Sequence, residues 1–291
     1  MFAKMRSRPV PWLFGLAFCF AILRCEAASG CVWKVTGSTG GTLFLGGSMH
    51  ALRSTDYPLP SAYNRAFDAS TRVSFEIEPK ALAGSGEGMI KAGRYPKGDS
   101  LKNHVDPRTY DYLLRVFGLL KIPEEKFSRY RPWLLVLLLD SPSSRGFSDD
   151  LGVDEFITKR ARANAKPMSG LESAAEHSAV FSGLTDRQSE ALLLVSFIPQ
   201  GDSAGNRERI MSAWRRGDVE ALARITHESY RDFAAFGDRL LGVRNHSWMP
   251  KLEGYLKSGQ TYLVVVGAAH LGGSDGLLAL FRARNYKVEQ L

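Results

Sequence analysis

The stretch Tyr262-Leu-Val-Val-Val-Gly-Ala-Ala-His270 decides the predicted fold. Its unbroken apolar run from Tyr262 to Val266 is typical of a strand that is buried on both faces of a sheet. Gly267 ends the run, because a residue without a Cβ lets the backbone turn sharply there. His270 is then expected at the rim of the sheet, where open α/β sheets bind ligands.

The same pattern occurs near the other end of the chain. Thr42-Leu-Phe-Leu-Gly46 is a short apolar run, and Gly47-Ser-Met-His50 then repeats the spacing Gly-x-x-His. One such spacing is common by chance and is compatible with a simple turn after a strand. Because each copy directly follows an apolar run, the pair predicts two neighbouring strands that direct two imidazoles to a shared point.

A third strand is predicted at Val73-Ser-Phe-Glu-Ile-Glu-Pro79, where apolar and polar residues alternate until proline ends the run. If helices cover both faces of the sheet, Glu76 is a carboxylate that needs a partner. If the strand is half exposed, Glu76 and Glu78 lie in water. The local pattern is compatible with both arrangements.

The remaining elements predict an α/β fold with a central, mostly parallel or mixed sheet that is flanked by helices. Val32 to Val35 and the run after the glycine-rich turn form a hairpin, and residues 81–100 are expected to be a loop. Residues 106–240 are mostly helical by period and are interpreted as a large insertion, with a fully buried helix from Trp133 to Leu139. The chain is predicted to close with helices over Lys251–Lys257 and Leu277–Arg284 and an edge strand at Val288.

The first 28 residues have the order of a secretory signal peptide. Basic residues up to Arg8 precede an apolar run from Trp12 to Leu23, and Ala27-Ala28 offers a small-residue cleavage site. The prediction is therefore an exported, periplasmic or extracellular protein with a single domain over residues 29–291, and an uncleaved anchor is the alternative. No later segment reaches the roughly 20 apolar residues of a membrane helix, so no stable span is expected after cleavage.

The net charge and the cysteine content limit the functions that are compatible with the predicted mature chain. Removal of residues 1–28 lowers the formal net charge from +8 to +5, and the remaining basic residues form no block. A nucleic-acid partner is therefore not expected. Cys31 is the only cysteine left in the predicted mature chain, so an intramolecular disulfide is excluded there.

The sequence resembles the TraB/GumN family, which includes the Tiki-type metalloproteases. The resemblance covers the predicted mature chain and rests on these segments: Trp33-Lys34, Leu43-Phe-Leu-Gly-Gly-Ser-Met-His50, Phe75-Glu76, Gly152-Val-Asp154, Gly170-Leu-Glu-Ser173, Trp214, Gly217-Asp218, Arg244-Asn245, Val265-Val-Gly-Ala-Ala-His-Leu271, Gly276 and Tyr286-Lys-Val288. It implies a metal-dependent hydrolase, with the peptidase activity of the Tiki branch, on an α/β core related to ChaN-like and erythromycin-esterase-like proteins. Met49 and Ala268-Ala269 depart from the family pattern.

In the residues that match the family motifs, His50 and His270 would bind a divalent metal ion, and Glu76 would be a third ligand or the general base. Two imidazoles and a carboxylate suffice for a catalytic site that keeps one position open for water. Arg244 would stabilise an oxyanion, Asn245 or His246 would assist, and Gly47 and Gly267 are the motif glycines. Such ligands suit Zn, Mn, Co or Fe, and the substrate is expected to be a peptide or a small molecule.

Two other functions fit the same residues. One is a metal-free, esterase-like hydrolase in which His50 is the base and Glu76 orients it. Ser48 is then a candidate nucleophile, because Gly46-x-Ser48 begins like a nucleophile elbow, although His50 occupies the place of the final glycine. The other is a non-catalytic protein of the ChaN-like type that binds a metal ion or haem. The sequence leaves the oligomeric state open.

Overall fold

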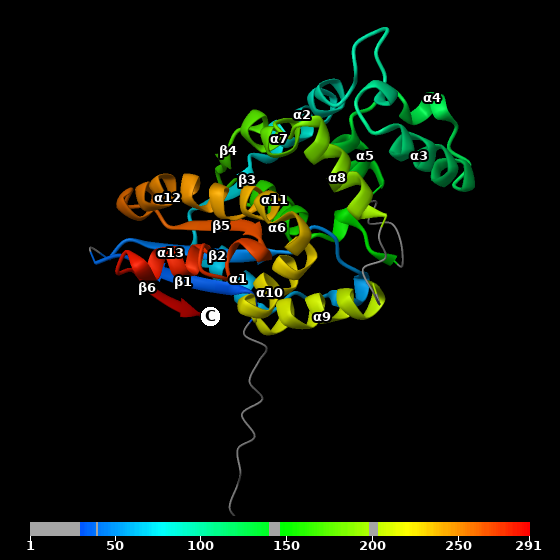
Figure 1. The fold of residues 1–291 in the computed structure, drawn as a ribbon. Coiled ribbons are helices and arrows are strands. Elements are labelled where there is room, and N and C mark those ends of the chain that lie inside the picture. The colour runs from blue at the N-terminus through cyan, green and yellow to red at the C-terminus, as the bar shows by residue number, and fades with distance from the viewer. Residues whose placement is uncertain (1–29, 39, 140–145, 198–202) are drawn as a thin grey trace, which may run out of the picture.

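The computed structural model describes residues 30–38, 40–139, 146–197 and 203–291. The predicted signal peptide, residues 1–28, lies outside the described residues. In the described part, helices surround a central sheet, so the predicted α/β class is confirmed (Figure 1).

The sheet has six strands in the order β4-β3-β5-β2-β1-β6. The strands are β1 (Val32–Thr36), β2 (Thr42–Ser48), β3 (Arg72–Ile77), β4 (Met168–Glu172), β5 (Tyr262–Gly267) and β6 (Lys287–Gln290). The pairs β2–β5, β3–β5 and β3–β4 are parallel, whereas β1 pairs antiparallel with β2 and β6. The sheet is therefore mostly parallel, with an antiparallel hairpin as predicted at its start.

The two strands that precede the Gly-x-x-His segments are neighbours, as predicted. In the register of β2 and β5, Gly47 lies opposite Val266 and Ser48 lies opposite Gly267. On the other side of β5, Phe75 of β3 lies opposite Val265. Because parallel strands end at the same edge of a sheet, the segments after β2, β3 and β5 emerge side by side.

The described residues contain thirteen α-helices. They are α1 (Ser61–Ala69), α2 (Pro79–Ala92), α3 (Pro107–Leu119), α4 (Glu124–Phe127), α5 (Pro132–Leu139), α6 (Val153–Ala163), α7 (Ala174–Ser182), α8 (Asp186–Ser196), α9 (Ser203–Arg216), α10 (Val219–Ser229), α11 (Ala234–Leu240), α12 (Gly242–Lys257) and α13 (Leu277–Ala283). In Figure 1, α3 and α4 stand away from the sheet, and α12 and α13 run alongside it.

The buried side chains of the described residues form three groups, and the smallest holds Val180, Leu192 and Phe236. The large core surrounds the sheet and includes Leu45, Val264, Trp214 and Trp248. A smaller core lies between the helices that include α3, α5 and α8, where Tyr95 and Phe117 are among the buried residues. The helical region therefore has apolar packing of its own.

Strand β4 was not predicted, because it lies inside the range that was interpreted as helical. It has only five residues, it contains a glycine, and only Leu171 among them is fully buried. Such a segment has little intrinsic preference for a strand and acquires one through its pairing with β3. Strand β4 is important for the site, because its last residue is Glu172.

The loop predicted for residues 81–100 was wrong over its first half, where α2 forms. Pro79 ends β3 and occupies the first turn of the helix, a position where its missing N–H costs nothing. The glycines Gly84, Gly86 and Gly88 indicated a loop. In α2 they are exposed, and a Cβ at any of them would contact nothing within 4 Å.

Helix α12 was predicted too short, because Pro250 was expected to precede its start. Proline inside a helix removes one backbone hydrogen bond, and the helix continues through it here. As a result Arg244 and Asn245 lie on a helix instead of a loop. Helix α5 forms where a helix was predicted, but it is not fully buried: Trp133 to Leu135 are buried, whereas Leu138 is exposed.

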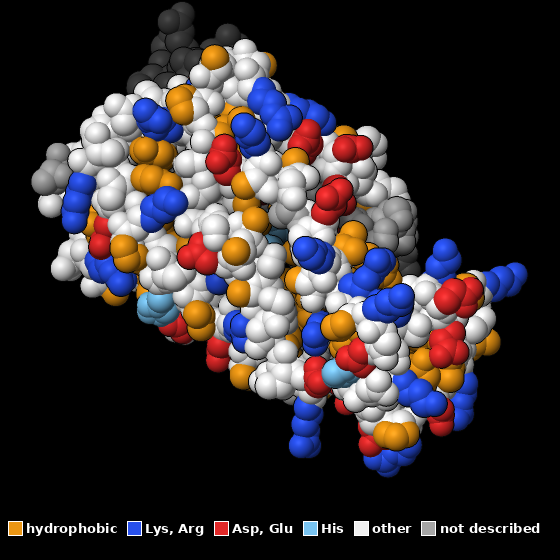
Figure 2. Space-filling model, turned by 90° about the horizontal axis from the view of Figure 1, so that it is seen from above, with side chains coloured by type: hydrophobic (Ala, Val, Ile, Leu, Met, Phe, Trp, Pro, Cys, Tyr) orange, Lys and Arg blue, Asp and Glu red, His pale blue; other side chains and the backbone are white. Residues whose placement is uncertain are grey.

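Among the described helices, none combines the length and the apolar character that crossing a membrane requires. On the face seen from above, Lys and Arg side chains alternate with Asp and Glu side chains and with hydrophobic ones (Figure 2).

His104 joins two parts of the helical region. Its Nδ1 lies 2.7 Å from Asp186 at the start of α8, and its Nε2 lies 2.8 Å from Asp99. The ring stacks on Tyr95, and Arg131 lies 3.7 Å from the other oxygen of Asp186. The hydrogen bonds to Asp186 and Asp99 raise the pKa of His104 above its ordinary value.

We therefore expect His104→Gln to destabilise the protein at pH 5.5 more than at pH 8.5. A raised pKa contributes stability that is fully present below the ordinary value of 6.5 and is lost as the pH rises through the folded-state pKa. For this partly exposed cluster the difference is at most about 1 kcal/mol, or roughly 2–4 °C in melting temperature. Thermal melts of wild type and His104→Gln between pH 5.5 and pH 8.5 measure this change. If the two melting temperatures differed by the same amount at both pH values, the expectation would be contradicted.

Candidate functional site

Three of the predicted side chains meet at the carboxyl ends of β2, β3 and β5. Gly267 marks the meeting point, because it leaves open the space that a side chain would fill. A Cβ at Gly267 would lie 3.3 Å from Glu76 Oε1, 3.6 Å from His50 Nε2 and 3.6 Å from His270 Cδ2. The two histidines and the glutamate therefore surround one small region.

The other motif glycine has a packing role. A Cβ at Gly47 would overlap the sulfur of Cys31, and its carbonyl oxygen accepts hydrogen bonds from Tyr63 and from Trp214 Nε1. Burial raises the pKa of the Cys31 thiol. Gly47 thus lets β2 pass close to buried side chains just before His50.

His50 lies at the mouth of the site, with 69% of its side chain exposed. Its Nδ1 is 2.9 Å from Asp154 Oδ2, and the Ser48 hydroxyl donates to the same oxygen. Asp154 and the hydrogen bond to it raise the pKa of His50 to about 9. Nε2 is directed to the region beside Gly267.

The backbone around Asp154 is fixed against the His50 segment. Val153 N donates to Met49 O over 3.0 Å, and Leu52 and Ser148 exchange two backbone hydrogen bonds. A Cβ at Gly152 would overlap the carbonyl oxygen of His50. The His50–Asp154 pair is therefore built into the joining of α6 to the chain after β2, unlike an ion pair between two free surface side chains.

His270 is buried, with 3% of its surface exposed, and its ring packs on Trp248. Asn245 Nδ2 donates to the carbonyl oxygens of His270 and Asp275, so its Oδ1 faces His270 Nδ1 at 2.7 Å. Nδ1 therefore carries the proton, and the electron pair of Nε2 faces Arg244 Nη1. Burial lowers the pKa of His270 to about 4, which keeps the ring neutral at pH 7.

Glu76 connects His270 with a buried arginine. Its Oε1 accepts a hydrogen bond from Gly267 N over 2.7 Å and lies 3.7 Å from His270 Nε2. Its Oε2 accepts from Arg244 Nη2 over 2.6 Å. Burial opposes ionisation, but interactions with His270, Arg244, His50 and the Gly267 N–H together hold the pKa of Glu76 below its ordinary value.

Arg244 is enclosed by these groups and is only 6% exposed. It donates to Glu172 from Nε over 3.1 Å and from Nη2 over 2.6 Å, and Nη1 lies 3.1 Å from Leu240 O and from His270 Nε2. The guanidinium therefore touches both carboxylates and the buried imidazole.

The remaining candidates lie outside the meeting point. Ser48 is 2% exposed, and its hydroxyl is used by Asp154. Asn245 holds His270 as described above. The His246 side chain is 52% exposed and pairs with Asp275, and among the described residues no hydrogen bond joins it to His50, Glu76 or His270.

Two acidic residues of the site, Asp154 and Glu172, were not predicted to belong to it. Both occur in segments on which the family resemblance rests, but both come from the range that was interpreted as a helical insertion. Glu172 is the last residue of β4, so recognising that strand would have placed its side chain at the same edge of the sheet as Glu76. Nothing in the local sequence connects Asp154 with His50.

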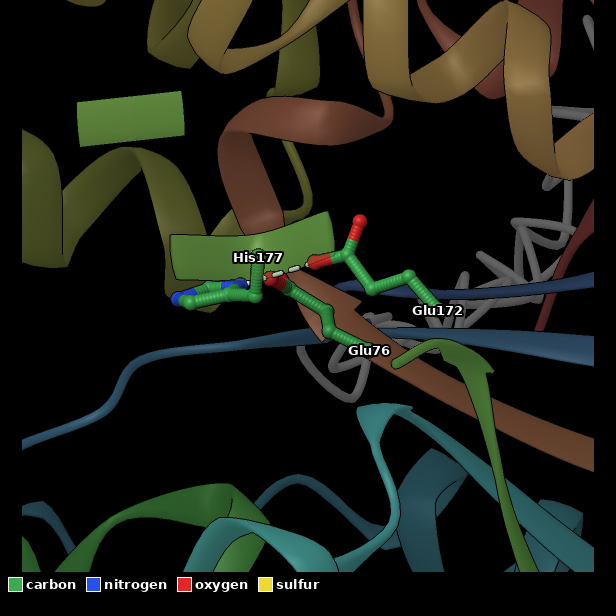
Figure 3. A group of neighbouring side chains, drawn as sticks. All are labelled: Glu76, Glu172 and His177. Atoms are coloured by element: carbon green, nitrogen blue, oxygen red, sulfur yellow. Dashed lines mark hydrogen bonds and ion pairs between the residues drawn. The ribbon is translucent and has the colours of Figure 1, made fainter. Parts of the chain in front are cut away.

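A group of metal-ligand type also occurs beside the predicted one. Single donor atoms of Glu76, Glu172 and His177 all lie within 4.8 Å of one another, and His177 Nδ1 is 2.7 Å from Glu172 Oε1 (Figure 3). The other ring nitrogen of His177 points away from both carboxylates (Figure 3).

Comparison with known proteins identifies the family. The profile of the TraB/PrgY/gumN family matches residues 31–290. The uncharacterized protein YbaP of Escherichia coli (strain K12) and that of Shigella flexneri are each 24% identical to the chain over 194 residues, which cover 64% of this chain and 70% of theirs. No solved structure matches the chain. Because the family match spans nearly the whole described chain, this protein belongs to the TraB/PrgY/gumN family.

Proposed function

We propose that the protein is a metal-dependent hydrolase of the peptidase type, in which His50, His270 and Glu76 hold one divalent ion. The observation that carries the proposal is the convergence of His50 Nε2, Glu76 Oε1 and the His270 ring beside Gly267. The choice of a peptide as substrate rests on the resemblance to the Tiki branch of the family.

The hydrogen-bond partners of the two imidazole rings suit such an ion. Metal-binding histidines almost always donate their second ring N–H to an acceptor. Here Asp154 accepts from His50 over 2.9 Å, and Asn245 accepts from His270 over 2.7 Å. In both rings Nε2 is thus the atom directed at Glu76. Binding requires two adjustments. Arg244 Nη1 has to leave His270 Nε2. The donor atoms of His50, Glu76 and His270, which do not all lie within 4.8 Å of one another, have to move closer together.

The charge of the site also supports a bound cation. Two carboxylates, Glu76 and Glu172, share the single guanidinium of Arg244 in a buried place. Buried carboxylates without full compensation are costly. With a pKa of about 9, His50 carries a second ring proton at pH 7, and this proton has to leave when an ion binds. With Asp154 included and the imidazoles then neutral, a divalent cation would bring the group to zero net charge.

When bound, a divalent ion in this place would lower the pKa of a water molecule toward 7 and polarise a substrate carbonyl. The protein groups would prepare that chemistry. The Gly267 N–H and Arg244 fix both oxygens of Glu76, so that Oε1 keeps its place as a third ligand or as a base. Because His50 is exposed, the side of the ion position next to it would be open to a substrate. Buried Arg244 is better placed to orient Glu76 than to contact an oxyanion.

A metal-free hydrolase is the second candidate, and the His50–Asp154 pair favours it. A carboxylate that accepts from Nδ1 leaves Nε2 as a base once the ring has lost its second proton, as in catalytic His–Asp pairs. The pKa of about 9 means that such a base would act best at alkaline pH. In this version Asp154 orients His50, in place of Glu76. Ser48 would be a poor nucleophile, because its hydroxyl is buried and donates to Asp154.

The deciding experiment measures metal content and peptide hydrolysis of the purified full chain before and after chelator treatment. The proposal expects turnover to disappear with the ion and to return with Zn²⁺, Mn²⁺ or Co²⁺. Turnover that is unaffected by complete metal removal would support the metal-free hydrolase. Stoichiometric metal binding without turnover of any peptide or ester would support the non-catalytic binding protein.

Asp154→Asn is expected to weaken metal binding by roughly 10–100-fold, because the second partner of a histidine ligand fixes its orientation and basicity. The amide oxygen of the new side chain would still accept a hydrogen bond but would carry no charge. The matched control is Asp150→Asn, which removes the same charge from a neighbouring exposed position without a hydrogen bond to His50. Metal titration by calorimetry compares the three proteins, and equal affinities for wild type and Asp154→Asn would contradict the expectation.

A further inference from the structure

Arg244 Nη2 lies at the centre of the donor group formed by Glu76, Glu172 and His177. It is 2.6 Å from Glu76 Oε2, 2.6 Å from Glu172 Oε1 and 3.2 Å from His177 Nδ1. These are the atoms of the group shown in Figure 3, and they come from β3, the end of β4 and α7. A positively charged nitrogen thus occupies the place that a metal ion would take among them.

The dimensions are close to those of a metal site. Zn²⁺ binds carboxylate oxygen and imidazole nitrogen at about 2.0–2.2 Å. The donors around Nη2 would therefore have to move inward by only about 0.5–1 Å to hold an ion. His177 Nδ1 now faces Glu172, and its proton would move to the other ring nitrogen, which points away from the carboxylates (Figure 3).

The guanidinium is held in this place from several sides. Nε donates to Glu172 Oε2, Nη1 lies 3.1 Å from Leu240 O at the end of α11, and the ring of Trp248 lies 4.7 Å from the guanidinium carbon. A surface pocket lined by Glu172, Glu176, Arg239, Val243 and Arg244 adjoins it. An ion from solvent would therefore have an entry path if the guanidinium were absent.

We propose that Arg244 is a built-in cation in a second metal position, and that Glu76, Glu172 and His177 bind a divalent ion when the guanidinium is removed. The first metal position, between His50, Glu76 and His270, depends on the proposed function, whereas the second position does not. If both positions were filled, Glu76 would be a ligand in each of them. Arg244 thus restricts the natural site to a single metal ion.

The test counts the Zn²⁺ ions bound by the full chain, by calorimetry and by native mass spectrometry, in wild type, Arg244→Ala and Arg244→Lys. Arg244→Ala is expected to bind one ion more than wild type and to melt at a higher temperature when Zn²⁺ is added. Arg244→Lys keeps a cation and is expected to bind the same number as wild type. The additional ion should disappear in the double variant Arg244→Ala/Glu172→Gln.

Arg239→Ala is the matched control, because Arg239 adjoins the same pocket but donates to the carbonyl oxygens of Gly183 and Ala179. It is expected to gain no ion. If wild type binds none and Arg244→Ala binds one, the second position is supported and the metal-dependent hydrolase is not. Equal numbers in wild type and Arg244→Ala overturn the inference.

Loss of Arg244 leaves two buried carboxylates without their partner, so Arg244→Ala is prone to unfold without metal. Arg244→Gln, which keeps an uncharged donor, is measured in parallel. If both variants remain unfolded in saturating Zn²⁺, the inference is also overturned, because an ion in that position would replace the missing charge.

Discussion

Replacing either His50 or His270 by alanine is expected to reduce metal-dependent hydrolysis by roughly 10²–10⁴-fold, the effect typical of a group that acts directly in the chemistry. Each variant should also lose the bound ion, which is measured independently by metal analysis. The two differ in stability. His50→Ala loses the pair with Asp154 at an exposed position and should lower the melting temperature less than His270→Ala does. His270→Ala leaves a cavity beside Trp248 and an unpaired Asn245 oxygen.

His246→Ala supplies the matched control for His50→Ala. Both histidines are largely exposed, and each pairs with a single aspartate, His50 with Asp154 and His246 with Asp275. Only His50 adjoins Gly267, Glu76 and His270. His246→Ala should therefore keep the ion and full turnover. Full metal-stimulated activity in either His50→Ala or His270→Ala would remove that residue from the proposed ligand set.

The part of the site that could be predicted from the sequence comes from the parallel strands. The runs before Gly47 and Gly267 are apolar, so both were recognised as buried strands, and they are direct neighbours in the sheet. Glu76 could be placed on a third strand, but its local pattern fitted a buried or an exposed carboxylate equally. Its burial follows from the packing of α12 over the strand ends, which brings Arg244 to it.

The remainder depends on contacts that local patterns do not encode. Asp154 reaches His50 from 104 residues away, through backbone hydrogen bonds that fix the start of α6. Glu172 reaches Arg244 because the five residues of β4 pair with β3, although they have little strand preference of their own. Arg244 belongs to a helix that continues through Pro250, which the proline rule would have ended.

The same contacts explain why the roles of Arg244 and Glu76 have to be considered together. Arg244 is almost fully buried, since Glu76, Glu172, His270 and Leu240 surround its guanidinium. Its charge therefore acts on the two buried carboxylates, Glu76 and Glu172. An arginine that keeps a glutamate ionised in a buried site fixes both the position and the charge of the carboxylate that faces the two imidazoles.

Glu76→Gln is accordingly expected to remove the bound ion and to lower turnover by roughly 10²–10⁴-fold. Both oxygens of Glu76 accept hydrogen bonds, one from Gly267 N and one from Arg244 Nη2. A glutamine has one oxygen, so its amide nitrogen must face one of these donors. The loss of a hydrogen bond to a charged group should cost about 1.5–3 kcal/mol of unfolding free energy, measured by denaturant titration.

Glu172→Gln is the matched control, since it also removes one buried carboxylate from Arg244. The pKa values of Glu76 and Glu172 are both lowered in the folded protein. Each carboxylate therefore contributes stability that is present above the ordinary pKa of 4.5 and is lost as the pH falls below that value. Both variants should therefore lose less stability than wild type between pH 5 and pH 3. Only Glu76→Gln should lose the ion, because only Glu76 faces His50 and His270. If Glu172→Gln lost the ion and Glu76→Gln kept it, the metal would lie on the Glu172 side of Arg244, away from the two imidazoles.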